Sequence, residues 1–235
     1  MSVLKIRIKF GKYGAMKFIG HLDIMRYFQK AMRRAGIPIS YSGGYSPHMI
    51  MSFASPLGVG LTSGGEYMDI EAGECLSSEE AVRRLNDVMV EGMKVFSYRL
   101  LPEDAGNAMS LVAAADYLVS FREGCAPALA WQDRLHDFFS QTEIPILKKT
   151  KKSETVVDIK PLIHTLALCE GDIISMRLSA GSADNLKPEL VMKAFASFIG
   201  IEFPPFGIKI HRKDLYAWME NSLLPLEALG DNIGE

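Results

Sequence analysis

The sequence lacks closely spaced cysteines. Tens of residues separate its three cysteines, Cys75, Cys125 and Cys169, so no pair has the spacing of a zinc knuckle, a redox dithiol or an iron–sulfur motif. The sequence therefore excludes a protein that holds a metal cluster on a short cysteine motif. We expect three separate thiols and no bound cofactor or metal.

Long apolar runs are also missing. No run is long enough to cross a bilayer, and the first ten residues, MSVLKIRIKF, alternate instead of forming the apolar segment of a signal peptide. We therefore expect a cytoplasmic protein with no membrane partner. Its 235 residues are 48% hydrophobic, which is enough to bury a core in one large or two small domains.

Acidic residues are nearly absent from the first sixty positions. Asp23 stands alone there against nine Lys and Arg residues, whereas residues 61–110 contain ten acidic and four basic side chains, and the whole chain has a net charge of -2. Such segregation favours a positive surface that meets an anionic partner. The alternative is that the basic segment docks on the acidic segment that follows it.

The first hundred residues contain a recognisable order of elements. Apolar and charged residues alternate over residues 4–10, as in a strand with one wet face, and helical spacing over residues 21–35 predicts a helix that ends at Gly36. Further strands are predicted at 49–54, 66–72 and 94–100, with a helix over 77–90. The order strand, helix, strand, strand, helix, strand is typical of a ferredoxin-like domain.

The second half repeats this order with additions. The patterns predict a strand at 116–122, a helix at 127–141, two short strands around a lysine-rich turn within 144–159, a hairpin over 163–180, a helix at 187–200 and a strand at 206–216. We therefore predict an α+β protein of two tandem ferredoxin-like (βαββαβ) domains. They occupy residues 1–104 and 111–222, the second with insertions, and a loose tail spans 223–235.

One stretch resembles a known family. Between residues 20 and 70 the chain carries the segments GHLD, RRAGIP and SGGYSPH. They are similar to the Ser-His-Leu-Asp, Arg-Arg-Ala-Gly-Leu-Pro and Ser-Gln-Gly-Phe-Asn-Pro-His-Pro segments of the radical SAM-linked proteins, a domain of unknown function. The matching residues are His21, Leu22, Asp23, Arg26, Arg33, Arg34, Ala35, Gly36, Pro38, Ser42, Gly44, Pro47 and His48, followed by Glu66 and Tyr67.

The resemblance implies partners. Members are encoded beside, or fused to, a radical SAM protein, and often near genes for ribosomal proteins and an RNA-processing nuclease. A radical SAM enzyme needs three closely spaced cysteines for its cluster, so this chain is expected to be the companion of such an enzyme. Gly20 stands where the family has serine, so a role for that hydroxyl does not apply here.

RNA binding is the interpretation that uses most of the cations. The predicted first helix places four cations on one side, the first strand exposes Lys5, Arg7 and Lys9, and tyrosines in the basic segment could stack on bases. The candidate anion- or RNA-binding residues are Lys12, Lys17, His21, Arg26, Lys30, Arg33, Arg34, Tyr45, His48, Lys148, Lys149, Lys151 and Lys152. For the strand cations the alternative is pairing with Tyr67, Asp69 and Glu71 on the adjacent strand.

Three hypotheses about function remain open. In the first, the chain is a non-catalytic partner that holds tRNA or rRNA, with no DNA expected. In the second it is an enzyme that uses His21, Asp23 and His48 on an anionic small molecule, although Asp23 also suits a helix start that pairs with Arg26. In the third it is a protein-docking module without nucleic acid.

Overall fold

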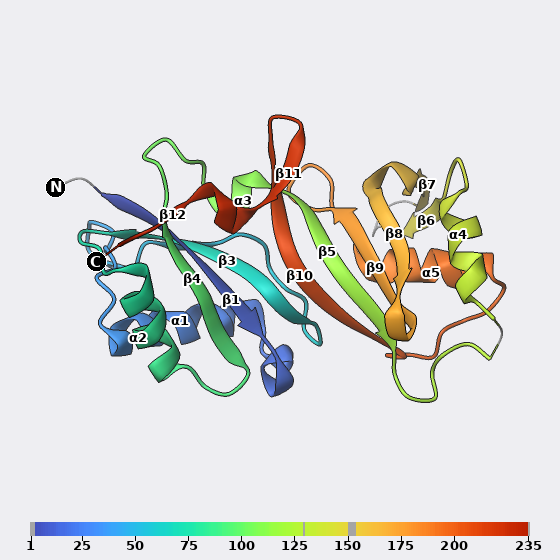
Figure 1. Cartoon of the computed structure of the whole chain (residues 1–235), viewed down its shortest axis with the longest axis horizontal. Coiled ribbons are helices and arrows are strands. Elements are labelled where there is room, and N and C mark those ends of the chain that lie inside the picture. The colour runs from blue at the N-terminus through green and yellow to red at the C-terminus, as the bar shows by residue number, and fades with distance from the viewer. Residues whose placement is uncertain (1–2, 129, 150–153, 235) are drawn as a thin grey trace. The chain divides into compact units, whose positions relative to one another are not determined.

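A computed structural model describes residues 3–128, 130–149 and 154–234 (Figure 1). The chain forms two compact units. Unit 1 contains residues 1–113 and 214–235, and unit 2 contains residues 114–213. The chain therefore leaves unit 1 once and returns to it. No described helix is long and apolar enough to cross a membrane.

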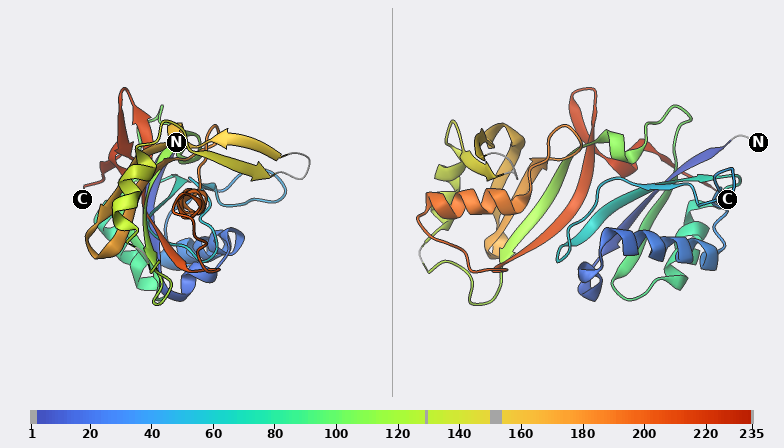
Figure 2. Two further views of the ribbon diagram at one scale, coloured as in Figure 1. Left: turned by 90° about the vertical axis from the view of Figure 1, so that its right-hand side faces the viewer. Right: turned by 180° about the vertical axis from the view of Figure 1, so that it is seen from behind.

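Unit 1 contains the basic segment. Its elements are β1 (Leu4–Lys12), η1 (Gly14–Phe18), α1 (His21–Ala35), β2 (Met51–Phe53), β3 (Thr62–Ala72), α2 (Ser78–Val88), β4 (Met93–Leu100), α3 (Ala108–Leu111), β11 (Ser222–Pro225), η4 (Leu226–Leu229) and β12 (Asp231–Asn232). β1 pairs in antiparallel fashion with both β3 and β4, and β2 pairs with β3. The helices α1 and α2 lie on one face of these strands (Figure 2).

Local signals set the ends of the two helices. α1 ends at Gly36, whose φ of 63° is left-handed and whose N–H bonds the last turn, as the sequence predicts. α2 begins after Ser77, whose side chain accepts a hydrogen bond from the Glu80 N–H. Both helices then turn an apolar stripe toward the sheet.

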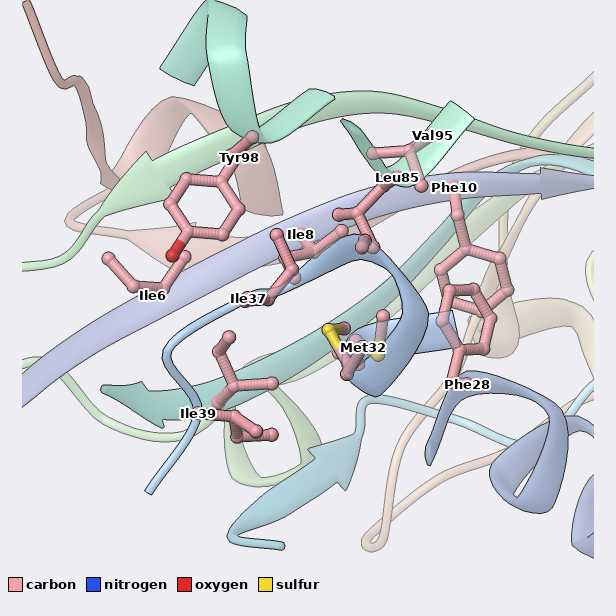
Figure 3. Close-up of a cluster of buried hydrophobic side chains, with 14 of the residues drawn as sticks. Ile6, Ile8, Phe10, Phe28, Met32, Ile37, Ile39, Leu85, Val95 and Tyr98 are labelled. Atoms are coloured by element: carbon pink, nitrogen blue, oxygen red, sulfur yellow. The ribbon is translucent and has the colours of Figure 1, made fainter. Parts of the chain in front are cut away.

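The core of unit 1 lies between these helices and the sheet. Ile6, Ile8 and Phe10 alternate along β1 toward the helices, where they meet Phe28 and other apolar side chains of α1 and α2 (Figure 3). The ring centroids of Phe10 and Phe28 are 4.6 Å apart. Packing of this kind fixes the orientation of α1, and with it the side that α1 turns to solvent.

The elements of unit 2 occur in the predicted order along the chain. They are β5 (Val112–Phe121), α4 (Gln132–Phe139), β6 (Pro145–Lys149), β7 (Glu154–Asp158), η2 (Lys160–Leu162), β8 (Ile163–Cys169), η3 (Glu170–Asp172), β9 (Ile173–Ser179), α5 (Pro188–Phe198) and β10 (Ile208–Met219), the last of which continues into unit 1. Its core includes buried Trp131, which contacts Phe121 and Phe195 edge-on.

The prediction of two tandem ferredoxin-like domains is wrong. Such domains would each close a sheet of four strands, but the hydrogen-bonded order in the described chain is β12-β4-β1-β3-β10-β5-β9-β8, with β2 beside β3 and β11 beside β10. The fold is a mixed α+β fold built on this large sheet. Local periodicity identifies strands but not their partners, and the 12-residue β10 pairs with strands far away in sequence.

The C-terminal residues are not a loose tail. β11 pairs with β10, and β12 pairs with β4 through Asp231 and Asn232. The intervening η4 contacts β1. η4 and α3 lie on the face of the unit 1 sheet opposite α1 and α2 (Figure 1). That face is therefore covered by the protein's own chain.

Candidate functional site

Helix α1 presents a cationic face, which we define as Arg26, Lys30, Arg33 and Arg34. All four side chains are exposed. At about 100° per residue they fall within an arc of roughly 100°, opposite the buried Ile24, Phe28, Ala31, Met32 and Ala35. The helix therefore separates an apolar side from a positive side.

The positive charges of the cationic face are little neutralised by carboxylates of the protein itself. Arg26 is 3.4 Å from Asp23, but both side chains are largely exposed, so this pair contributes at most about 1 kcal/mol. Arg33 donates only to the backbone carbonyl of Gln29 in its own helix. Within the described residues, Asp23 is the single carboxylate in an ion pair with this face.

The start of α1 is built differently from the sequence-based expectation. Lys12 is buried and donates to the carbonyl of Ile19, while Lys17 lies over the ring of Phe18, 5.0 Å from its centroid. His21 is half-buried and contacts Phe53 edge-on, with 5.4 Å between the ring centroids. Lys12 therefore does not belong to an exposed anion site.

The loop between α1 and β2 is closed by a serine–histidine pair. Ser42 Oγ is 2.8 Å from His48 Nδ1 and accepts a hydrogen bond from the His48 N–H. The Ser42 N–H donates in turn to the His48 carbonyl. Between them the loop exposes Tyr45 completely, and Tyr41 is about half exposed. The pair closes a turn. Among the described residues, no acidic side chain forms a hydrogen bond with His48, as the third member of a catalytic triad would.

His48 also lines a pocket of about 400 Å³ in unit 1, together with residues of β1, β2, β3 and the loop before α3. Neither His21 nor Asp23 lines this pocket. Asp23 is on the exposed side of α1 and His21 is against Phe53, so the structure does not gather the three candidate catalytic residues around this cavity.

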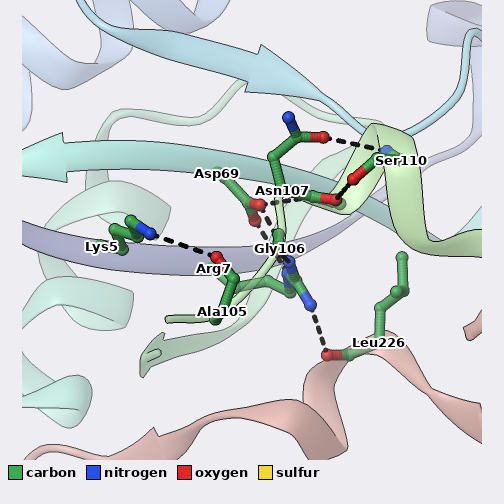
Figure 4. Close-up of polar contacts among 9 residues, drawn as sticks. Lys5, Arg7, Asp69, Ala105, Gly106, Asn107, Ser110 and Leu226 are labelled. Atoms are coloured by element: carbon green, nitrogen blue, oxygen red, sulfur yellow. Dashed lines mark hydrogen bonds and ion pairs between the residues drawn. The ribbon is translucent and has the colours of Figure 1, made fainter. Parts of the chain in front are cut away.

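The strand cations are structural. Arg7 is 1% exposed and donates through Nε and Nη2 to the two carboxylate oxygens of Asp69, at 2.8 and 2.9 Å (Figure 4). It also donates to the carbonyls of Gly106 and Leu226. Lys5 donates to the carbonyls of Glu103 and Ala105. Arg7 is therefore paired within the protein and not exposed to an anionic partner. Lys5 and Arg7 are not part of the candidate anion-binding surface.

Lys9 belongs to a partly buried polar cluster that the sequence did not predict. Its ammonium group lies 2.8 Å from Asp214 and 3.2 Å from Glu227, and the Tyr67 hydroxyl donates to Asp214 at 2.5 Å. Burial lowers the pKa of Lys9, but the two carboxylates outweigh it, so the pKa is raised overall. Burial and the charge of Asp214 raise the pKa of Tyr67 far above its ordinary value. No local pattern links residues so distant in sequence.

The remaining predicted cations are in unit 2. Lys148 and Lys149 lie in β6, where the backbone register places them opposite Thr155 and Glu154. Lys151 and Lys152 lie outside the described residues. Among the residues that the structure describes, no group of three or more His, Cys, Asp or Glu side chains could hold a metal ion.

Comparison with known families adds one match. Residues 5–188 match the family described as "Uncharacterized protein conserved in bacteria (DUF2344)". The chain belongs to this family. No curated protein matches the chain.

The DUF2344 match includes all of α1, the loop that Ser42 and His48 close, and the pocket beside it. It ends at the start of α5, so Asp214 and Glu227, the carboxylates that bind Lys9, lie beyond it. The cationic face is therefore part of the segment that the family model matches. The residues of β10 and η4 that bind Lys9 are not.

Proposed function

We propose that this DUF2344 protein is the companion of a radical SAM enzyme and holds RNA, either tRNA or rRNA, on the cationic face of α1. The observation that carries the proposal is the exposure of Arg26, Lys30, Arg33 and Arg34 on one side of a helix whose other side is anchored in the core. The radical SAM partner rests on the sequence resemblance described above.

The dimensions of the face suit a phosphate backbone. From Arg26 to Arg34 the helix rises about 12 Å at 1.5 Å per residue, a length that spans several phosphates of one strand. Exposed arginines release condensed counterions when they meet phosphates, which is the main source of affinity in sequence-independent binding. Because the pair with Asp23 is exposed, it offers little competition.

The loop that follows α1 adds aromatic groups. Tyr45 is fully exposed and Tyr41 is about half exposed, and exposed tyrosines are suited to stacking on unpaired bases. The covered face of the sheet does not take part, since Arg7 and Lys9 are engaged there with carboxylates. The proposal therefore expects binding to backbone and single-stranded bases, without base reading across a sheet.

Charge reversal tests the proposal. We expect the variant Arg26→Glu/Arg33→Glu/Arg34→Glu to bind bulk tRNA at least about tenfold more weakly than the wild type at one fixed salt concentration. The control is Lys94→Glu/Lys187→Glu/Lys209→Glu, which makes the same change in net charge at exposed sites elsewhere. Unchanged affinity in the first variant, or an equal loss in both, would count against the cationic face.

A second candidate function is docking to protein alone. Phe18, Leu22 and Val59 are 61–67% exposed, and the Gly60 N–H donates to the Lys17 carbonyl, which places Val59 near η1 and the start of α1. Exposed apolar groups beside cations are typical of protein interfaces. A complex with the radical SAM partner that survives nuclease, fails at high salt and is lost in Leu22→Ser would favour this alternative.

A further inference from the structure

The pocket beside His48 has a specific chemical character. Its walls come from one face of the unit 1 sheet, where Lys5, Asp69 and Glu71 lie on β1 and β3, and from the loop at residues 101–107. Figure 4 shows Lys5, Asp69 and part of this loop. Ile50, Met51, Ile70 and Leu101 also line it, with the side chains of Met51 and Ile70 turned into the core on the helix side of the sheet. A volume of about 400 Å³ is within the usual range for small-molecule sites.

Glu71 is the one carboxylate lining the pocket that has no partner among the described residues. Its side chain is half-buried, and it has no hydrogen bond or ion pair with any described residue. The register places it opposite Lys5, which would be its natural partner. However, the Lys5 ammonium group donates to the carbonyls of Glu103, at 2.6 Å, and Ala105, at 3.2 Å.

The second carboxylate of the pocket is already satisfied. Asp69 accepts both bonds from Arg7 and a third from the Ala108 N–H at 2.6 Å. A positively charged guest therefore has Glu71 as its available partner, and a half-buried carboxylate binds a charged donor more strongly than one in open solvent.

We propose that this pocket binds a small organic cation whose ammonium or guanidinium group pairs with Glu71. The carbon chain of the guest lies along Ile50 and Leu101, which accept methylene groups but offer no side-chain donors. The shared chemistry is an alkylammonium or alkylguanidinium group on a short chain. A free polyamine and a lysine or arginine side chain of a partner protein both supply it. The proposal does not depend on RNA binding by α1.

Calorimetric titration of the full chain tests the proposal with matched probes. Putrescine and agmatine represent free polyamines, and Nα-acetyl-lysine methylamide represents a protein side chain. Butyrate and 1-butanol provide the same chain length without a positive charge. We expect saturable binding of at least one cation and of neither control. Tighter binding of the polyamines identifies a free metabolite, and tighter binding of the lysine derivative identifies a partner protein.

Two variants connect binding to the pocket. Glu71→Gln keeps the shape of the side chain and removes its charge, so affinity for the cation should fall by at least about tenfold. Glu74→Gln removes an exposed charge nearby in sequence, outside the pocket lining, and should leave the affinity unchanged. Equal affinity in wild type and Glu71→Gln, or binding of butyrate, would overturn the proposal.

A measurement on the wild type covers the case in which Glu71→Gln does not fold. Methyl NMR signals of Ile50 and Leu101 should shift together as the bound cation saturates, with one dissociation constant. Signals of Val191 and Met192, which are buried in unit 2, should not shift. If no methyl signal of the pocket responds to any of the cations, no such site exists.

Discussion

At the scale of single residues, Arg7 shows that a cation in a basic segment can be structural. The alternation that predicts β1 places Lys5, Arg7 and Lys9 on one side, and this side is confirmed by the pairing of Arg7 with Asp69. The sequence could not decide between exposure and pairing, because the cover of that face comes from residues about one hundred and two hundred positions away. The face that each side chain occupies was predictable from the alternation, whereas the cover was not.

Loss of Arg7 should be costly. We expect Arg7→Ala to lower the free energy of unfolding by about 3–5 kcal/mol, since it leaves Asp69 buried without its partner. Arg26→Ala, at the exposed pair with Asp23, should change it by less than about 1 kcal/mol. Urea unfolding followed by circular dichroism measures both. A loss for Arg7→Ala no larger than that for Arg26→Ala would show that the buried pair is not needed for stability.

Tyr67 and Lys9 predict a loss of stability in alkali. Both pKa values are raised in the folded protein, so above about pH 10 the unfolded chain releases protons that the folded protein keeps. The stabilisation is therefore complete below pH 10 and declines above it. Removing the Tyr67 titration should make the decline shallower by up to about 1.4 kcal/mol per pH unit.

The variant Tyr67→Phe isolates this contribution. At pH 7 it should lower the free energy of unfolding by about 1.5–3 kcal/mol, because the hydrogen bond to the charged Asp214 is lost. Tyr45→Phe, at a fully exposed position, should leave the stability at pH 7 unchanged. Unfolding is measured from pH 7 to 11, and an alkaline slope in Tyr67→Phe as steep as in the wild type would contradict the assignment.

At the scale of elements, the sequence was most informative about α1. The helix His21–Ala35 and its end at Gly36 are as predicted, because the helical period and a glycine in left-handed conformation are both local signals. The surroundings of His21 and His48 were harder to predict, since they depend on which strand lies beside α1. The cationic face could be predicted from spacing alone, but the pocket beside His48 required β1, β3 and the 101–107 loop to meet.

The end of α1 gives a prediction at this scale. Gly36 has a φ of 63°, so Gly36→Ala should lower the free energy of unfolding by about 1–2 kcal/mol, although the added methyl group has space. Gly20, at the other end of the helix, has a φ of -75° and open space, so Gly20→Ala should have a much smaller effect. Equal effects of the two substitutions in thermal unfolding would show that the left-handed turn is not what ends the helix.

At the scale of the whole molecule, the prediction of the fold class failed although most elements were correctly placed. Most strands were visible in the sequence, apart from β11 and β12, but β10 pairs with β3 and β5, and unit 1 is completed by residues 214–235. Such long-range pairings leave no periodic signal, because any strand with a suitable face could occupy the same position. The charge segregation pointed to the basic segment, but Arg7, Lys9 and Lys12 of that segment bind partners within the protein.

The most direct test of the account is the salt dependence of tRNA binding. Each phosphate contact contributes about 0.7 to 0.9 to the slope of log K against log salt concentration, so removing three arginines in Arg26→Ala/Arg33→Ala/Arg34→Ala should reduce that slope by about 2 to 3. We predict this reduction, together with an unchanged slope for Lys94→Ala/Lys187→Ala/Lys209→Ala. A slope in the arginine variant equal to that of the wild type would show that tRNA does not contact the cationic face.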